Sequence, residues 1–173
     1  MGSNSPDTAR GLAETSQPSS VWLRRATLVG LAAFVLASAL TLFGVRTVVA
    51  SSEGGGYRLS VEHPRVARAG LDVVWEVTVH RDSPLDRELQ LAVTGSYLDL
   101  FETQAFHPEP LESSRDGDTL YLTFATTPGS DTLVVAYDAY IQPAAQRGRD
   151  GRVAVIVDGG PVVSTDFSTF LMP

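Results

Sequence analysis

The chain contains one run of twenty consecutive residues without an ionisable side chain, from Ala26 to Val45. Arg24 and Arg25 stand immediately before this run, and Arg46 stands immediately after it. At about 1.5 Å per residue, a helix of this length covers roughly 30 Å, which is the thickness of the hydrocarbon core of a bilayer. The run therefore predicts a membrane-spanning helix over residues 26–46.

The predicted span divides the rest of the chain into three segments. Residues 1–25 are rich in serine and contain few large apolar side chains, which predicts a disordered tail. Residues 47–56 end in Ser51-Ser52-Glu53-Gly54-Gly55-Gly56, a composition that predicts a flexible linker. Residues 57–173 are numerous enough to form one domain with its own hydrophobic core.

Basic residues near the ends of the span predict its orientation. Arg24 and Arg25 flank the first end, whereas an acidic segment follows the second, so we expect a cytoplasmic N-terminus. The C-terminal domain is then extracytoplasmic, anchored to the cell membrane by a single pass. A cleaved signal peptide is an alternative, because Val48-Val49-Ala50 fits a cleavage site. The apolar core of a signal peptide is usually about 7–15 residues, however, which is shorter than this run. Arg24-Arg25 also resembles part of a twin-arginine signal.

Small residues recur along the predicted span at spacings of three and four. Because a helix turns about 100° per residue, these positions fall on one stripe. Small side chains let two helices approach closely in lipid, so the stripe predicts self-association or docking on another integral membrane protein. A general abundance of alanine and glycine in the chain is the alternative explanation. The predicted helix-packing face consists of Ala26, Gly30, Ala33, Ala37, Thr41 and Gly44.

Composition argues against several functional classes. Beyond residue 50 the chain has nine arginines against eighteen aspartates and glutamates, and such an acidic domain repels nucleic acids. The chain contains no cysteine, which excludes disulfides and thiolate metal sites. The three histidines, His63, His80 and His107, belong to no recognisable catalytic or metal-binding motif. We therefore expect no enzymatic activity, no cofactor and no nucleic-acid partner.

Residues 71–80 alternate apolar and polar side chains, with Trp75 at the centre of the apolar set. This period of two is typical of a half-buried β-strand. Turn residues separate similar segments, and Asp158-Gly159-Gly160 predicts a tight hairpin. Seven or eight short strands predict an all-β domain, an immunoglobulin- or fibronectin-like β-sandwich. The further predicted strands cover residues 57–61, 89–93, 120–124, 133–139, 153–157 and 162–170.

One apolar segment does not alternate in this way. It is either a plug that closes one end of the sandwich or an exposed patch for a protein partner. The candidate partner patch consists of Tyr97, Leu98, Leu100, Phe101 and Phe106.

Two charged loops are further candidates for binding. Arg147, Arg149 and Arg152 form a basic loop that is either a solvated hairpin tip or a site for lipid phosphates or a partner's carboxylates. Asp116-Gly117-Asp118 is either a tight turn or part of a calcium loop.

The whole pattern resembles single-pass membrane proteins of the high-GC Gram-positive (actinobacterial) type that carry an immunoglobulin-like extracytoplasmic domain. The resemblance rests on the span, on basic residues that are all arginine, and on Tyr57–Pro64 and Val153–Phe170 at the two ends of the domain. It implies no particular site residues. We predict a non-enzymatic, membrane-anchored domain that binds or stabilises another envelope membrane protein. A ligand- or cation-binding sensor module, or a β-sandwich secreted after signal-peptide cleavage, are the alternatives.

Overall fold

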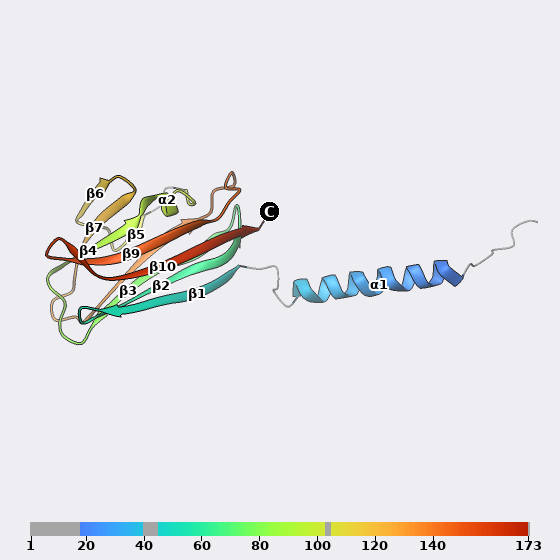
Figure 1. Ribbon diagram of the computed structural model, residues 1–173, viewed down its shortest axis with the longest axis horizontal. Coiled ribbons are helices and arrows are strands. Elements are labelled where there is room, and N and C mark those ends of the chain that lie inside the picture. Colours follow the sequence, from blue (N-terminus) through green and yellow to red (C-terminus); the bar gives the residue numbers. More distant parts are fainter. Residues whose placement is uncertain (1–17, 40–44, 103–104, 173) are drawn as a thin grey trace, which may run out of the picture. The chain divides into compact units, whose positions relative to one another are not determined.

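The computed structural model describes residues 18–39, 45–102 and 105–172. An N-terminal helical unit and a β-rich unit that begins at Gly44 are separate compact bodies, and each is described by itself. The predicted combination of an apolar N-terminal helix and an all-β domain is confirmed at this level (Figure 1).

Helix α1 extends over Pro18–Ala39. Its segment Val21–Ser38 has a mean hydropathy of 1.4 and is long and apolar enough to cross a membrane, a property shared by anchors and signal sequences. The helix begins eight residues before the predicted start of the span, so residues 18–25 are helical instead of part of a disordered tail. Proline is favoured at a first helical position, and arginine is a good helix former, which explains this early start. Residues 1–17 and 40–44 lie outside the described part of the chain.

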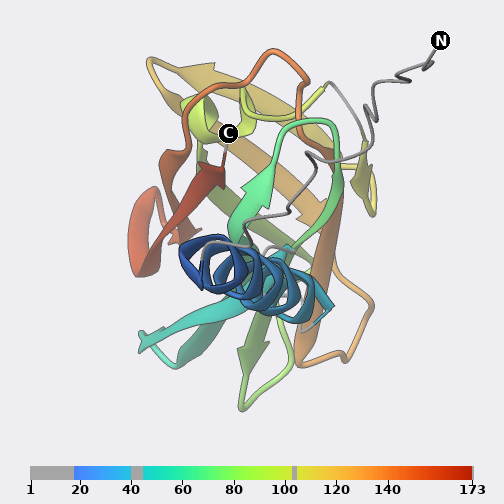
Figure 2. The ribbon, with the colours of Figure 1, turned by 90° about the vertical axis from the view of Figure 1, so that its right-hand side faces the viewer.

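Within its described residues, the β domain contains ten strands and one helical turn, α2 (Gly95–Leu98). The order along the sheet is β5-β8-β3-β2-β10-β9-β4-β7-β6, and β1 pairs with β2 outside this path. The pairs are antiparallel except for β2 with β10. The sheet curls so that its two halves face each other (Figures 1 and 2). The strands are β1 (Arg46–Gly54), β2 (Tyr57–Arg68), β3 (Asp72–Arg81), β4 (Glu88–Thr94), β5 (Phe106–His107), β6 (Glu112–Asp116), β7 (Thr119–Ala125), β8 (Thr132–Tyr140), β9 (Arg149–Val157) and β10 (Gly160–Met172).

The seven predicted strand segments all fall on observed strands, namely β2, β3, β4, β7, β8, β9 and β10. The structure has ten strands, whereas the sequence predicts seven or eight. The three additional strands are β1, β5 and β6. β5 has only two residues, and every residue of β6 is exposed, so neither strand has an apolar alternation that the sequence could reveal. The predicted hairpin is present, since Asp158 and Gly159 take the positive φ angles that its two-residue turn requires.

Strand β1 occupies residues for which the sequence predicts the end of the span and a flexible linker. It pairs with β2 from Arg46↔Val66 to Gly54↔Tyr57, so residues 47–56 differ from the predicted linker. Gly55 and Gly56 have positive φ angles of 59° and 80° and form a two-residue hairpin turn between these strands. The glycine run thus supplies backbone conformations for a turn, whereas a linker would need only flexibility.

The core lies between the inward faces of the two halves of the sheet. Trp75 of β3, the predicted core anchor, is 1% exposed. Its ring meets the rings of Phe106 and Tyr137 edge-on, at centroid distances of 6.3 and 6.1 Å. Such edge-to-face pairs stabilise a core beyond the burial of their area.

Strand β2 changes its neighbour near Pro64. Residues 57–62 pair with β3, whereas residues 66–68 pair in parallel with β10. Proline has no N–H and cannot donate to a continuous ladder, so this position is compatible with a switch. The carbonyl of Pro64 accepts a hydrogen bond from Thr169 Oγ1 at 2.6 Å, and that hydroxyl in turn accepts one from Tyr97 at 2.8 Å. A buried polar chain therefore ties α2 and β10 to the switch in β2.

Gly151 of β9 tests how tightly this region is packed. A Cβ atom at this position would lie 2.6 Å from Cε2 of Phe167 and 2.9 Å from Cγ of Tyr97. We expect Gly151→Ala to lower the free energy of unfolding by about 1–3 kcal/mol, because the rings must leave their packed positions. Urea denaturation of the full chain in detergent measures this change. Gly160→Ala is the control, since its Cβ would meet nothing within 4 Å, and equal effects of the two substitutions would contradict the packing argument.

Candidate functional site

The predicted apolar partner patch is not a surface. Tyr97, Leu100 and Phe101 are at most 2% exposed, so the exposed-patch interpretation is corrected in favour of a plug. The ring of Tyr97 meets those of Phe101 and Phe167 edge-on at 5.6 and 4.8 Å. A single helical turn followed by an isolated bridge has no regular period, which is why the sequence alone left both interpretations open. The partly buried members, packed against the same core, are Leu98 and Phe106.

The predicted basic loop is divided by the structure. Arg152 lies on the outer face of β9 and binds Asp166 through two hydrogen bonds, Nε to Oδ1 at 2.5 Å and Nη2 to Oδ2 at 3.1 Å. These bonds raise the pKa of Arg152 and lower the pKa of Asp166. Arg147 and Arg149 are exposed, and no carboxylate in the described part of the chain lies within ion-pair distance of either. Arg147 and Arg149 therefore form no close ion pair, although the charge of Arg149 acts on Asp118.

Strand pairing brings further basic residues to the same end of the domain. Val66 of β2 is the register partner of both Arg46 and Phe170, and Arg68 is opposite Met172. The loop before β9 lies against this row, because a Cβ atom on Gly148 would be 2.9 Å from Cα of Phe170. Figure 2 views the domain from this end, where β10 ends. We call the group the basic end; it consists of Arg46, Arg68, Arg147, Arg149 and Phe170.

Within the described residues, the four arginines of the basic end lack close carboxylate partners. Elsewhere in the domain, Arg58, Arg81 and Arg115 each lie within ion-pair distance of a carboxylate. In the part of the chain that the structure describes, Arg65 and Arg87 have no such partner either. Phe170 is 62% exposed, which is unusual for a phenylalanine on a strand. The sequence analysis missed Arg46, Arg68 and Phe170, because only the register of β1, β2 and β10 places them together.

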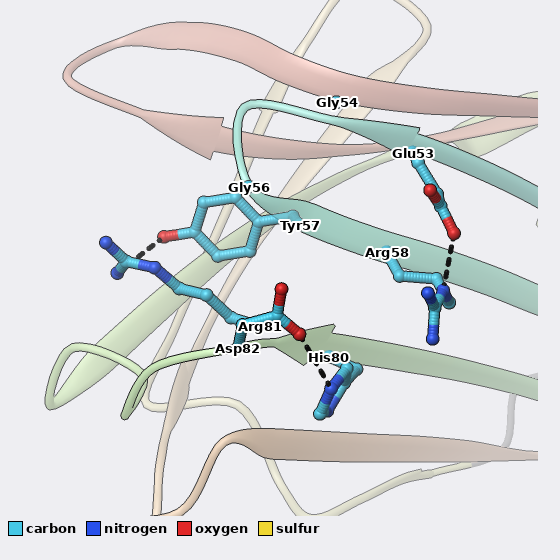
Figure 3. A pocket seen from close by; sticks show the side chains of 8 residues that line it. All are labelled: Glu53, Gly54, Gly56, Tyr57, Arg58, His80, Arg81 and Asp82. Carbon is cyan, nitrogen blue, oxygen red and sulfur yellow. Dashed lines mark hydrogen bonds and ion pairs between the residues drawn. The ribbon is translucent and has the colours of Figure 1, made fainter.

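A small hollow lies at the opposite end of β2, with a volume of about 180 Å³ (Figure 3). Glu53 accepts a hydrogen bond from Arg58 Nε at 2.6 Å, which raises the pKa of Arg58. Arg81 lies over the ring of Tyr57 and donates to its hydroxyl at 3.3 Å. Both guanidinium groups that line this hollow are therefore already engaged, and an anionic ligand would have to displace those contacts.

The three histidines lie on different elements. His107 of β5 contacts Asp138 at 3.1 Å on the surface, and His80 of β3 contacts the hydroxyl of Thr132 at 3.0 Å. His63 is buried in β2. No group of three His, Asp or Glu side chains in the described residues is arranged to hold a metal ion. The structure thus does not bring the histidines together.

Asp116, Gly117 and Asp118 form the turn between β6 and β7, with a positive φ of 56° at the glycine. The carboxylate of Asp118 accepts hydrogen bonds from the backbone N–H of Ser96 at 2.7 Å and from its hydroxyl at 2.6 Å. The bond from the Ser96 hydroxyl is the main cause of the lowered pKa of Asp118, with smaller contributions from Arg115 and Arg149. This carboxylate links the β6–β7 turn to α2.

The predicted helix-packing face is only partly within the described residues. Ala26, Gly30 and Ala33 are exposed on α1 and Ala37 is half-buried, while Thr41 and Gly44 lie outside the described part. A Cβ atom on Gly30 would meet nothing within 4 Å. The face stays a prediction about contacts with another helix.

Among the strands that the structure describes, three are outer strands, and they differ in length and charge. β5 has two residues, and β6 has five, of which Glu112, Arg115 and Asp116 are charged. β1 has nine residues, and within the described part of the chain it is hydrogen-bonded to β2 alone. Its residues Thr47–Ser52 are uncharged and contain no proline. Charges, proline and short length are the usual means by which proteins protect such edges, so β1 is the least protected edge.

No protein-family model matches the chain, and no curated protein matches it.

His63 predicts a dependence of stability on pH. The centroid of the His63 ring lies 5.0 Å from that of Phe167, and His63 is 3% exposed. Burial is the main cause that lowers the pKa of His63; backbone hydrogen bonds with Val61 and Ser168 oppose it, and the charge of Arg65 adds a smaller lowering effect. Since the folded state holds the neutral imidazole, protonation favours unfolding, and stability is lost as the pH falls below the unfolded value of about 6.5.

We therefore expect the free energy of unfolding to fall between pH 7.5 and 5, by about 1.4 kcal/mol for each full unit by which the pKa is lowered. His63→Gln should remove this component, because it keeps a neutral polar group at the position. Denaturation curves of both proteins across this pH range measure the difference. Identical pH profiles would show that His63 does not titrate with unfolding.

Proposed function

We propose that this protein is a membrane-anchored, non-enzymatic β domain that binds another envelope membrane protein by accepting an extended segment along β1. The observation that carries the proposal is the unprotected free edge of β1, which begins seven residue steps after the last residue of α1. Pairing of an extended segment with a sheet edge is a common mode of protein recognition.

Several features support anchorage and orientation. The apolar helix α1 has the length and hydropathy of a membrane span. Arg24 and Arg25 favour a cytoplasmic N-terminus, which places the β domain on the extracytoplasmic side. The exclusive use of arginine among the basic residues supports a high-GC bacterial source. The small-residue face of α1 offers a second contact, with a helix of the same partner.

The order of the strands supports an immunoglobulin-like type for the domain. In that fold one sheet contains strands A, B, E and D, and the other contains G, F and C. Here β2, β3, β8 and β5 are neighbours in that order, followed on the other side by β10, β9 and β4. In this assignment β1 is an additional strand at the outer edge of strand A. An additional strand at this place explains why the edge is long and free.

The free edge of β1 can be blocked without breaking its pairing with β2. In an antiparallel pair, hydrogen-bonded and non-bonded positions alternate. Counting from the Gly54–Tyr57 pair that closes the turn, Val48 and Ala50 bond to β2, while the N–H of Val49 points to the free edge. Proline at position 49 therefore removes an edge donor, and proline at position 48 removes a bond within the domain.

We expect a photo-crosslinking residue at Ser51, in the full chain in native membranes, to give one dominant product with a second membrane protein. Val49→Pro should reduce this product at least tenfold, because the partner segment loses the N–H group of residue 49 as a hydrogen-bond donor. Gel analysis after irradiation measures the product, and alkaline carbonate extraction verifies that both proteins stay embedded. The Val48→Pro variant reports the separate effect of weakening the fold itself.

A crosslinking residue at Ser114 on β6 is the matched control, since β6 is an outer strand protected by charge. Equal products from Ser51 and Ser114 would contradict a specific role of β1. A product with twice the mass of the chain would assign the edge to a second copy of this protein. Release of the unmodified chain by carbonate would overturn the anchorage on which the proposal depends.

A further inference from the structure

The basic end of the β domain gathers arginines without carboxylate partners in a domain that is otherwise acidic. From residue 45 onward the chain has ten arginines and eighteen aspartates and glutamates. Four of those ten arginines belong to the basic end, and within the described residues none of the four forms an ion pair. Excess negative charge elsewhere repels an anionic surface, so this end can approach one with the least repulsion.

We propose that the basic end binds the phosphate head groups of anionic lipids and holds the β domain against the bilayer in one orientation. This inference uses the anchorage argued under the proposed function but does not depend on a partner at β1. We assign a lipid surface as the binding partner of the basic end. The segment that follows the proposed membrane anchor enters the β domain at this end, through Val45 and Arg46. A bilayer surface is therefore the charged surface nearest to these residues along the chain.

The chemistry of the residues matches such a surface. Guanidinium groups donate several hydrogen bonds in a planar fork, which suits phosphate oxygens. Phe170 of β10 lies in register with Arg46 of β1 across Val66 and is exposed, and phenylalanine is one of the apolar residues that enter the boundary between head groups and acyl chains. Leu71 lies in the turn between β2 and β3, directly after the end of β2, and is 41% exposed. Its carbonyl accepts a hydrogen bond from the backbone N–H of Ile141. Arginines that surround exposed apolar side chains are typical of surfaces that bind bilayers.

A groove of about 590 Å³ adds a concave element to this end. Arg147, Gly148 and Arg149 line it together with the amide of Gln142, and the one carboxylate that lines it is Asp99. Asp150 is a second acid close by, in register with Ser168. Asp72, Glu102 and Asp118 also lie near this end, since Asp72 is in register with Tyr140, Glu102 bonds to Tyr140 and Arg149 acts on Asp118. The end is therefore close to neutral, and most of the negative charge of the domain lies elsewhere. Binding here would come from direct hydrogen bonds between exposed guanidinium groups and phosphate oxygens.

The absence of cysteine from the chain allows a direct test with single labels. The full chain is reconstituted in nanodiscs of phosphatidylcholine, with or without phosphatidylglycerol, and carries one fluorophore on Ser168→Cys. Ser168 is exposed and lies two residues before Phe170 on β10. Lipids with a nitroxide on the head group quench the fluorophore when the basic end is docked. A label on Thr127→Cys, in the turn between β7 and β8 at the opposite end, is the positional control.

We expect quenching at position 168 to increase at least threefold when phosphatidylglycerol is present, with little change at position 127, and to weaken in high salt. Arg147→Ala with Arg149→Ala should lower the ratio of docked to undocked domain roughly twentyfold, since each arginine near an anionic surface contributes about a fivefold factor. Arg58→Ala with Arg87→Ala removes the same charge from the opposite end and should leave quenching unchanged.

Equal quenching in the two lipid compositions, or equal loss in the two double variants, would overturn the proposal. Quenching that requires another reconstituted membrane protein would assign the basic end to a protein partner and would overturn it as well. A chain that does not co-purify with the nanodiscs would contradict the membrane anchorage of the proposed function. An embedded chain whose basic end does not dock would contradict only the lipid-binding proposal.

Discussion

The division of β2 between two neighbours is the constraint on which the rest of the domain depends. β2 pairs with β3 before Pro64 and with β10 after it, and this single strand thereby joins the two halves of the sheet. Because the halves then face each other, each can bury the apolar side chains of the other. The hydrogen-bond chain from Tyr97 through Thr169 to Pro64 satisfies the polar atoms that the switch leaves inside the core. A buried carbonyl without this partner would destabilise the fold at the place where its connectivity changes.

The same switch produces both candidate interaction surfaces. Since β10 pairs with only the last residues of β2, β1 can occupy the longer part of the β2 ladder and becomes an outer strand. The parallel contact also brings the end of β10 beside the beginning of β1, which places Phe170 and Arg46 on one row across Val66. The free edge and the basic end are therefore two consequences of one topological feature. Neither depends on a sequence motif.

This dependence on topology explains what the sequence could and could not predict. Strands such as β3 and β8 bury one face, so their apolar residues alternate and the strands were predictable. β6 buries none of its residues, and no pattern marks it. β1 carries a half-buried alternation from Val48 to Gly54, but its serines and glycines resemble those of a linker, and only the pairing partner distinguishes the two. The cluster around Tyr97 was found by composition, yet burial rather than composition decides between a plug and a patch.

The two proposed contacts constrain each other when they are taken together. If the basic end rests on lipid, β1 begins at the bilayer surface and runs away from it, since Arg46 is its first residue. A partner segment that pairs with β1 directly after leaving the same membrane must then run parallel to β1. A segment that pairs while returning to the membrane must run antiparallel. In the first case crosslinks from Thr47 reach partner residues close to the partner's own membrane helix, and crosslinks from Ser51 reach residues farther along the segment. In the antiparallel arrangement, crosslinks from Ser51 reach partner residues that precede those reached from Thr47 in the partner's sequence. The direction of pairing would therefore identify which part of the partner binds.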